Sequence, residues 1–180
     1  MGRVLHNGAD VLLFGCGGGA LATSLCDGPS CVTVVDNNAI SFEIARRYFW
    51  VPPSVRCVVD EMAQFLETCA IAYPAIGVDV GGPCFDYEEV LDHRTCALLR
   101  RHLKTSGRLT INIACDHDRD ETPERIGRQL SDDEFHVWIC ATDTDVGRNA
   151  VIVASDDQGL ATKLKGDASA FGMTVREVRE

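Results

Sequence analysis

Short apolar runs rich in β-branched residues alternate with segments of helical periodicity along most of the chain. Four such runs are Val11–Phe14, Cys31–Val35, Val55–Val59 and Ala75–Val78, and each is followed directly by a glycine or an aspartate. Strands that alternate with helices run parallel in one sheet, with the helices packed on its two faces. The sequence therefore predicts an α/β domain built on a mostly parallel sheet.

Between the apolar runs, hydrophobic residues recur every three or four positions, which is typical of amphipathic helices. In one of these segments Ile40, Ile44, Ala45 and Tyr48 lie on a single stripe. The predicted helices are Gly19–Cys26, Ala39–Phe49, Met62–Cys69, Tyr87–Lys104 and Thr122–Leu130.

The last strands are expected to form a hairpin. After a fifth run at Arg108–Ala114, the runs Phe135–Ala141 and Ala150–Ala154 are separated by Thr142–Gly147 and its neighbours, which leave no room for a helix. These two strands should pair antiparallel at one edge of a seven-stranded, Rossmann-like sheet. We expect residues 1–156 to form one domain on this Rossmann-like sheet and residues 157–180 to be a helical extension of it.

Charge and hydropathy exclude several classes of partner. The formal net charge is −10, whereas binding to nucleic acid by counterion release needs a concentrated basic face. The densest basic clusters, Arg46–Arg47 and Arg100–His102, fall inside predicted helices. No apolar run approaches the roughly 20 residues of a membrane span, and no secretory signal is present at the N-terminus. We expect a cytoplasmic protein that binds neither nucleic acid nor membranes.

Cysteine usage points to a reducing compartment. The chain has nine cysteines, an odd number, and no C-x-x-C pair. Most of them lie in apolar stretches, where a free cysteine behaves as a small hydrophobic residue. The sequence predicts neither a disulfide framework nor a metal site.

The chemistry-bearing residues gather where the predicted strands end. A glycine cluster, GCGGG, follows the first strand, and an acid follows each of the next three strands. In open parallel sheets ligands bind beyond the carboxyl ends of the strands, and glycines let a ligand approach the next helix. The candidate cofactor-binding residues are Gly15, Gly17, Gly19, Asp36, Asn37, Asp60, Glu61 and Asp79.

Two nucleoside classes compete for this pattern. The nicotinamide fingerprint G-x-G-x-x-A is met by Gly15, Gly17 and Ala20, with Asp36 as its ribose-binding acid. Cofactors of the S-adenosylmethionine type use a similar turn, together with an acid after the third strand and an antiparallel seventh strand. Asp60 and the predicted hairpin favour the second class.

Several segments together resemble the spermidine synthases, which have the class I methyltransferase fold. The similar segments are Leu12–Ala20 (LLFGCGGGA), Val34–Asp36 with Arg46–Phe49, Val59–Leu66 (VDEMAQFL) and Val78–Pro83 (VDVGGP). The resemblance implies that Gly15, Gly17 and Gly19 form the cofactor loop. It also implies that Asp36 binds the ribose, Asp60 binds the adenine amine, and Asp79 is the general base.

The sequence departs from the family at positions that concern the amine substrate. Gly18 stands where the family has the acid that contacts the aminopropyl ammonium, and Gly82 replaces the second acid of its D-S-S-D motif. The first predicted strand begins about ten residues into the chain, where the family has an N-terminal β-domain. A polyamine without paired carboxylates would leave buried charges uncompensated.

We therefore expect a methyltransferase that binds S-adenosylmethionine, or its decarboxylated form, and acts on a small acceptor. A true aminopropyltransferase and a non-catalytic nucleotide-binding module remain alternatives, and a homodimer is possible. The His/Asp cluster at Cys115–Asp118 is expected to be an ordinary polar loop, because no second histidine lies at metal-ligand spacing.

Overall fold

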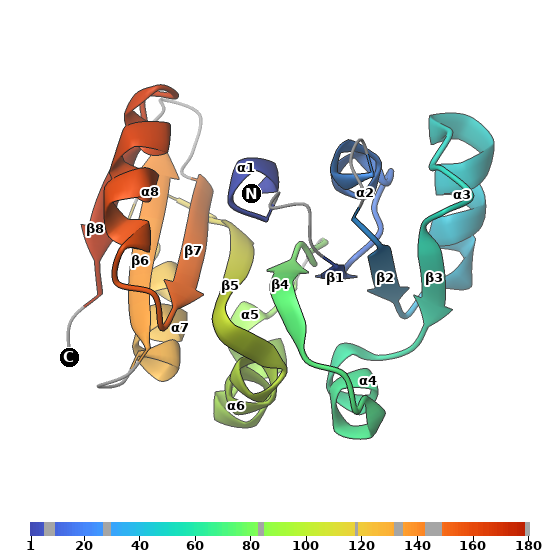
Figure 1. Cartoon of the computed structure of the whole chain (residues 1–180), viewed down its shortest axis with the longest axis horizontal. Helices are drawn as coiled ribbons and strands as arrows, with labels where there is room; N and C mark the ends of the chain where they lie inside the picture. The colour runs from blue at the N-terminus through green and yellow to red at the C-terminus, as the bar shows by residue number, and fades with distance from the viewer. Residues whose placement is uncertain are drawn as a thin grey trace.

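The computed structural model describes residues 1–5, 10–26, 30–82, 85–117, 119–131, 135–142 and 149–178. In this part of the chain eight strands form one sheet, in the order β3-β2-β1-β4-β5-β7-β6-β8 (Figure 1). The strands are β1 (Val11–Phe14), β2 (Val32–Asp36), β3 (Arg56–Val59), β4 (Tyr73–Val78), β5 (Leu103–Ala114), β6 (His136–Thr142), β7 (Asn149–Ser155) and β8 (Thr174–Glu177).

The parallel sheet and the terminal hairpin are confirmed. Strands β3, β2, β1, β4 and β5 are parallel, and β7 runs antiparallel between β5 and β6. The count of seven strands was wrong, because β8 adds an eighth strand alongside β6. Its four residues, TVRE, include a single aliphatic side chain, so no apolar run predicts it.

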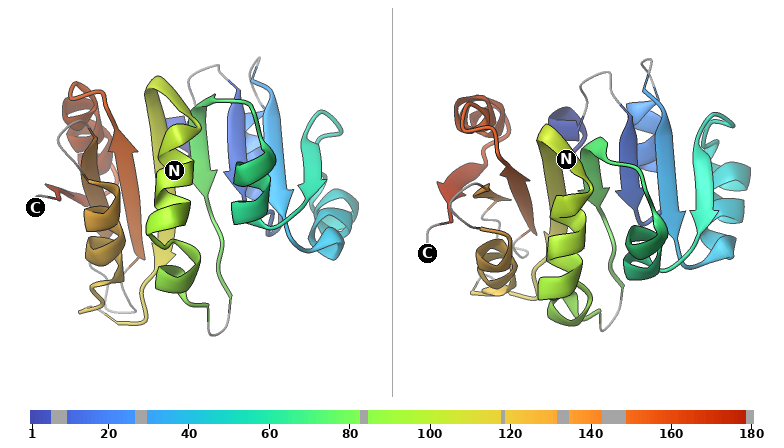
Figure 2. Two further views of the ribbon diagram at one scale, coloured as in Figure 1. Left: turned by 90° about the horizontal axis from the view of Figure 1, so that it is seen from below. Right: turned by 60° about the horizontal axis from the view of Figure 1, so that its bottom comes forward.

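Helices cover both faces of the sheet (Figures 1 and 2). Helices α1, α2, α3 and α8 pack on one face, and helices α4, α5, α6 and α7 on the other. The helices are α1 (Gly2–Leu5), α2 (Ala20–Leu25), α3 (Ala39–Phe49), α4 (Met62–Thr68), α5 (Tyr87–Val90), α6 (His93–Arg101), α7 (Thr122–Leu130) and α8 (Leu160–Ser169). None of these helices is long and apolar enough to cross a bilayer.

The single helix predicted at Tyr87–Lys104 is instead two helices. Asp92 has an extended backbone and caps α6, because its side chain accepts the Thr95 N–H at 2.8 Å. Strand β5 then begins at Leu103, where the prediction placed the end of that helix, and Leu103 pairs with Tyr73 of β4. The pairing shifts register between Tyr73 and Ala75. The first residues of β5, LKTSG, are mostly polar and exposed, so no apolar run predicts them.

The predicted bounds of α3 are confirmed, but of its predicted stripe only Ala45 is buried. Phe42 and Ala45 are the buried residues of the helix. Ile40, Ile44 and Tyr48 are exposed by 60%, 43% and 60%. The helix packs through a narrow face instead of through its widest apolar stripe.

Three features named from the sequence lie outside the described residues. They are the turn at 143–148, Pro83 and Asp118. The described cysteines are all free thiols.

Candidate functional site

The carboxyl ends of β1, β2, β3 and β4 surround a cavity of about 470 Å³. Of the predicted site residues, seven line it: Gly15, Gly17, Asp36, Asn37, Asp60, Glu61 and Asp79. Gly19 lies behind this surface, where it packs against Val51. A second cavity of about 420 Å³, at the opposite edge of the sheet beside Arg101 and Lys104, contains none of the predicted residues.

The glycine loop holds β1 and β4 close together. Gly15 has φ 93°, and a Cβ placed on it would lie 2.1 Å from the carbonyl oxygen of Asp79. The Asp79 N–H in turn donates to the carbonyl of Phe14 at 2.8 Å. Gly17, with φ 48°, has no atom within 4 Å of the equivalent position. The loop therefore needs glycine at residue 15 for packing, whereas at residue 17 it leaves open space over the backbone.

Asp36 holds the glycine loop in place from the end of β2. Its Oδ2 accepts the Cys16 N–H at 2.8 Å, and its Oδ1 accepts the Asn38 N–H at 2.8 Å. A carboxylate has about four acceptor positions, so both oxygens retain the capacity to accept further donors from the cavity.

Cys16, inside the glycine loop, is a poor nucleophile. Burial of the thiol raises its pKa to about 11, and the nearby charge of Asp36 acts in the same direction. The thiolate is the reactive form of cysteine. At neutral pH this side chain therefore acts as a packing group in the loop.

Asp60 and Glu61 form the acidic wall at the end of β3. The Glu61 N–H donates to Asp60 Oδ1 at 2.9 Å, and Asn37 donates from Nδ2 to Glu61 Oε1 at 3.1 Å. The Asn37–Glu61 contact joins the loops that follow β2 and β3. Because the two residues are 24 positions apart in the chain, no local pattern predicted the contact.

Asp79, at the end of β4, belongs to a chain of amides that the sequence analysis missed. Asn112 of β5 donates from Nδ2 to Asp79 Oδ1 at 2.9 Å, and Asn149 of β7 donates to Asn112 Oδ1 at 3.1 Å. The side-chain oxygen of Asn112 thus accepts from Asn149, and the NH₂ group of Asn112 donates to Asp79. The one available signal was an asparagine inside the apolar run of β5.

An adjoining cavity of about 330 Å³ shares Phe85 with the first one. The Phe85 ring packs edge-on against Tyr87, with the ring centroids 4.8 Å apart. Four acids line this cavity: Asp86, Glu88, Asp116 and Asp120.

Three of the acids of the adjoining cavity already have structural partners. Asp86 caps α5 by accepting the Glu88 N–H at 3.0 Å, and Asp120 accepts the Thr122 N–H at 2.9 Å. Glu88 forms an ion pair with Arg125 at 2.7 Å. Among the described residues, no three His, Cys, Asp or Glu side chains are grouped to hold a metal ion.

The fold has well-matched counterparts among solved structures, although no family model and no curated protein sequence matches the chain. A spermidine synthase in complex with the transition-state analogue AdoDATO is 17% identical, with a TM-score of 0.69 over 85% of this chain. A probable spermidine synthase from Corynebacterium glutamicum is 18% identical, with a TM-score of 0.70 over 95%. Human methyltransferase-like protein 13, in complex with SAH, is 16% identical, with a TM-score of 0.72 over 94%.

These proteins differ in how much of their own length the chain spans. The chain covers 57% and 66% of the two spermidine synthases, and 86% of methyltransferase-like protein 13. The strand order and the antiparallel β7 agree with this similarity. The chain has the class I methyltransferase fold that spermidine synthases and S-adenosylmethionine-dependent methyltransferases share.

Proposed function

We propose that this chain binds S-adenosylmethionine in the cavity at the ends of β1–β4 and transfers its methyl group to a small acceptor. The observation that carries the proposal is the convergence of Asp36, Asp60 and Asp79 on one cavity beside the glycine loop. The open space at Gly17 is a further fit, because a ligand can approach the backbone there.

The binding roles follow from the carboxylate oxygens that can still accept hydrogen bonds. Asp36 can accept both ribose hydroxyls, since each carboxylate oxygen makes only one hydrogen bond to the protein. Asp60 has one oxygen engaged by Glu61, and the other can accept the exocyclic amine of adenine. Val35 and Met62 give the same cavity apolar walls, which suit the faces of a base.

We assign to Asp79 the role of general base. When bound, the cofactor supplies an electrophilic methyl group. Asn112 occupies Oδ1 of Asp79, so Oδ2 is the atom free to take a proton from the acceptor. An acceptor that takes up this methyl group would release a proton, and Asp79 would receive it. A positioned base of this kind contributes about 10²–10⁴-fold to a rate.

Aminopropyl transfer from decarboxylated S-adenosylmethionine is the second candidate. The observation that favours it is the acidic cavity beyond Phe85, which would attract a cationic amine. Three of its four acids are already engaged by helix caps or by Arg125. Arg125 compensates the charge of Glu88, and the caps occupy acceptor positions of Asp86 and Asp120, so fewer acceptors are left for an amine. Methyl transfer remains our first proposal. The free thiols suit the reducing cytoplasm, where we place the reaction.

The two reactions are separated by the product. The chain is incubated with either form of the cofactor and with a panel of amines, thiols and alcohols, and the acceptors are analysed by mass spectrometry. We expect methylated acceptors with the wild type and none with Asp79→Asn. Aminopropylated products only from the decarboxylated form would establish the second candidate. Binding of the cofactor without any product would indicate a non-catalytic module.

A further inference from the structure

A further cavity, of about 480 Å³, lies between α1 and α8 on the face of the sheet that both helices cover (Figures 1 and 2). Helix α1 packs over β4 and β5, and α8 packs over β6 and β7. Thr142 and Asp167 are the only hydroxyl or charged side chains among the described lining residues. We name this space the α1–α8 cavity, and its apolar walls include Cys140, Val151, Ala168 and Phe171.

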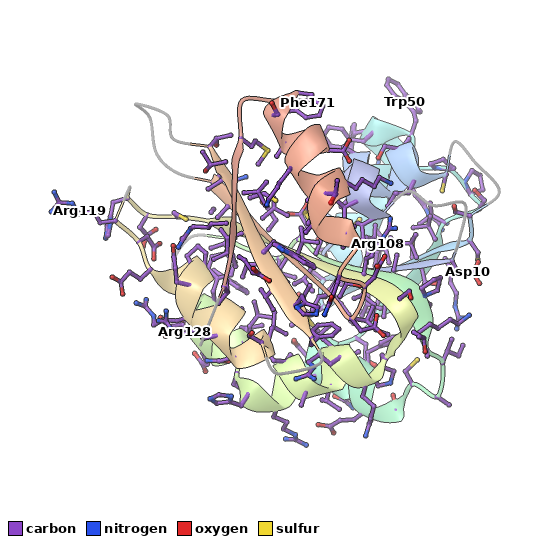
Figure 3. All side chains as sticks on the ribbon, turned by 60° about the vertical axis from the view of Figure 1, so that its left-hand side comes forward. Asp10, Trp50, Arg108, Arg119, Arg128 and Phe171 are labelled. Carbon is purple, nitrogen blue, oxygen red and sulfur yellow. The ribbon has the colours of Figure 1, made fainter. Side chains whose placement is uncertain are left out.

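The α1–α8 cavity exists because the buried side chains of α8 become smaller toward its carboxyl end. They are Leu160, Leu164 and Ala168, so two leucines that fill the space over the sheet are followed by one small residue. Phe171, which is 57% exposed, lies just beyond this end of the helix (Figure 3). Space is thus left under the last turn of α8, beside an exposed aromatic ring.

The α1–α8 cavity lies on the same face of the sheet as the amide chain that reaches Asp79. Residues that pair directly across antiparallel strands share a face. Asn112 of β5 pairs with Val151 of β7, and Val151 pairs with Cys140 of β6. Asn112 itself donates to Asp79. Because neighbouring strands are ~4.8 Å apart, the wall at Val151 is about 10 Å from the end of β4.

The edge of the cavity nearest to Asp79 is polar. Thr142 lines the cavity and pairs with Asn149, the residue that donates to Asn112. Polar side chains therefore continue from Asp79 through the two asparagines to Thr142. An apolar space of roughly 300–1,000 Å³ with a few polar groups at one end is typical of a small-molecule site.

We propose that the α1–α8 cavity binds the apolar body of the methyl acceptor, and that this acceptor is an uncharged thiol or phenol. The inference rests on the proposed function and adds the class of its substrate. The acceptor's sulfur or oxygen takes up the methyl group and passes its proton to Asp79. The products are then a neutral thioether or aryl ether and neutral S-adenosylhomocysteine.

The charge of the lining favours an uncharged acceptor. Asp167 is the one charged side chain of the described lining, so an anion meets a like charge here. A cation gains one partner, whereas the cavity beyond Phe85 offers it four acids, and an ammonium without partners in an apolar space is costly. Thiols and phenols enter uncharged at neutral pH, because they ordinarily ionise with pKa values of about 8.5 and 10.

Isothermal titration without cofactor tests the cavity. The two ligands are benzyl mercaptan and benzylamine, which share one apolar body and differ in carrying a thiol or an ammonium group. We expect benzyl mercaptan to bind one-to-one and at least tenfold more tightly than benzylamine. Ala168→Leu extends a side chain into the cavity and should weaken this binding at least fivefold. The matched control is Ala161→Leu, on the same helix but outside the cavity lining, and it should bind as the wild type does.

A second variant covers the case in which Ala168→Leu does not fold. Phe171→Ser removes an apolar side chain at an exposed position and should also weaken the binding of benzyl mercaptan severalfold. Circular dichroism and thermal unfolding confirm that each variant is folded. The proposal is overturned if the folded wild type shows no saturable binding of benzyl mercaptan, if both cavity variants bind it as the wild type does, or if benzylamine binds more tightly.

Turnover separates this inference from the proposed function. With S-adenosylmethionine the wild type should methylate benzyl mercaptan. Ala168→Leu should raise KM for the thiol and change neither kcat nor the affinity for S-adenosylmethionine by much, because it leaves Asp79 and the cofactor cavity intact. A wild type that does not bind S-adenosylmethionine would contradict the proposed function. Methylation of benzylamine but not of benzyl mercaptan would overturn this inference alone.

Discussion

Asn112 donates a hydrogen bond to Asp79 at 2.9 Å and so fixes the carboxylate at the end of β4 from the neighbouring strand. Asn149 holds the Asn112 amide in the required orientation. Three strands thereby contribute to the position of one acid. One carboxylate oxygen is oriented by the protein, and the other is left for the ligand.

This arrangement predicts a preference for the charged cofactor. The sulfonium of S-adenosylmethionine is positive, whereas the sulfur of S-adenosylhomocysteine is neutral. Asp79→Asn should reduce the affinity for S-adenosylmethionine about two- to fivefold, the range of a solvent-exposed ion pair, and leave that for S-adenosylhomocysteine unchanged. Isothermal titration measures both constants. Asn112→Ala should change the ratio of the two affinities in the same direction but by less. If Asp79→Asn leaves the ratio of the affinities for S-adenosylmethionine and S-adenosylhomocysteine unchanged, a contact of Asp79 with the sulfonium is excluded.

The glycine loop predicts a ranking of three alanine variants. Gly15→Ala should lower the free energy of unfolding by more than about 3 kcal/mol, because its Cβ meets the Asp79 carbonyl and φ is 93°. Gly17→Ala meets no atom but has φ 48°, so it should cost about 1 kcal/mol. Gly18→Ala makes ordinary contact with Phe49 and should be close to neutral. Urea unfolding tests this order, and equal losses at residues 15 and 18 would refute it.

Asp60 predicts recognition of the exocyclic amine of adenine. A hydrogen bond to a charged group contributes about 1.5–3 kcal/mol, or roughly 10–100-fold in affinity. The wild type should therefore bind S-adenosylhomocysteine at least tenfold more tightly than the inosine analogue, which lacks the amine. In Asp60→Ala the two ligands should bind almost equally. Discrimination that survives this substitution would assign the amine to another group.

Asp92 predicts an acid-sensitive contribution to stability. The hydrogen bonds from Thr95 lower the pKa of the Asp92 carboxyl. The folded state thus favours the carboxylate, and the stabilisation is complete above the unfolded value near 3.9 and lost as the pH falls through the folded pKa. Asp92→Ala should cost about 1 kcal/mol at pH 7. Asp92→Asn keeps a cap but should lose this one contribution, so its free energy of unfolding in urea should fall less at acid pH than that of the wild type. An equal fall in both proteins would contradict this assignment.

Local sequence patterns predicted the elements that carry the site. The apolar runs that end at Asp36, Asp60 and Asp79 became β2, β3 and β4, and these acids meet because parallel strands end at one edge of the sheet. The antiparallel β7 followed from the short connection before it. These features depend on short sequence patterns and on general rules of sheet topology.

The missed features depend on contacts between distant segments. Strand β8 is polar and forms only because the edge of β6 is available to pair with it. The stripe that contains Ile40 and Ile44 has the pattern of a buried face, but periodicity alone does not show which side of the helix meets the sheet. The contact of Asn112 with Asp79 joins residues 33 positions apart. No local pattern encodes such a pair.

The most direct test of the central claim is an isothermal titration of the chain with S-adenosylmethionine, repeated on Asp36→Asn. Asp36 holds the loop at Cys16 and faces the cavity, so its substitution should weaken binding at least tenfold. Asp10→Asn, an exposed acid just before β1 at the opposite end of that strand, is the control and should bind as the wild type does. The predicted result is one-to-one binding by the wild type and by Asp10→Asn, and binding at least tenfold weaker by Asp36→Asn. Absence of binding by the folded wild type, or equal affinity in Asp36→Asn, would contradict the account.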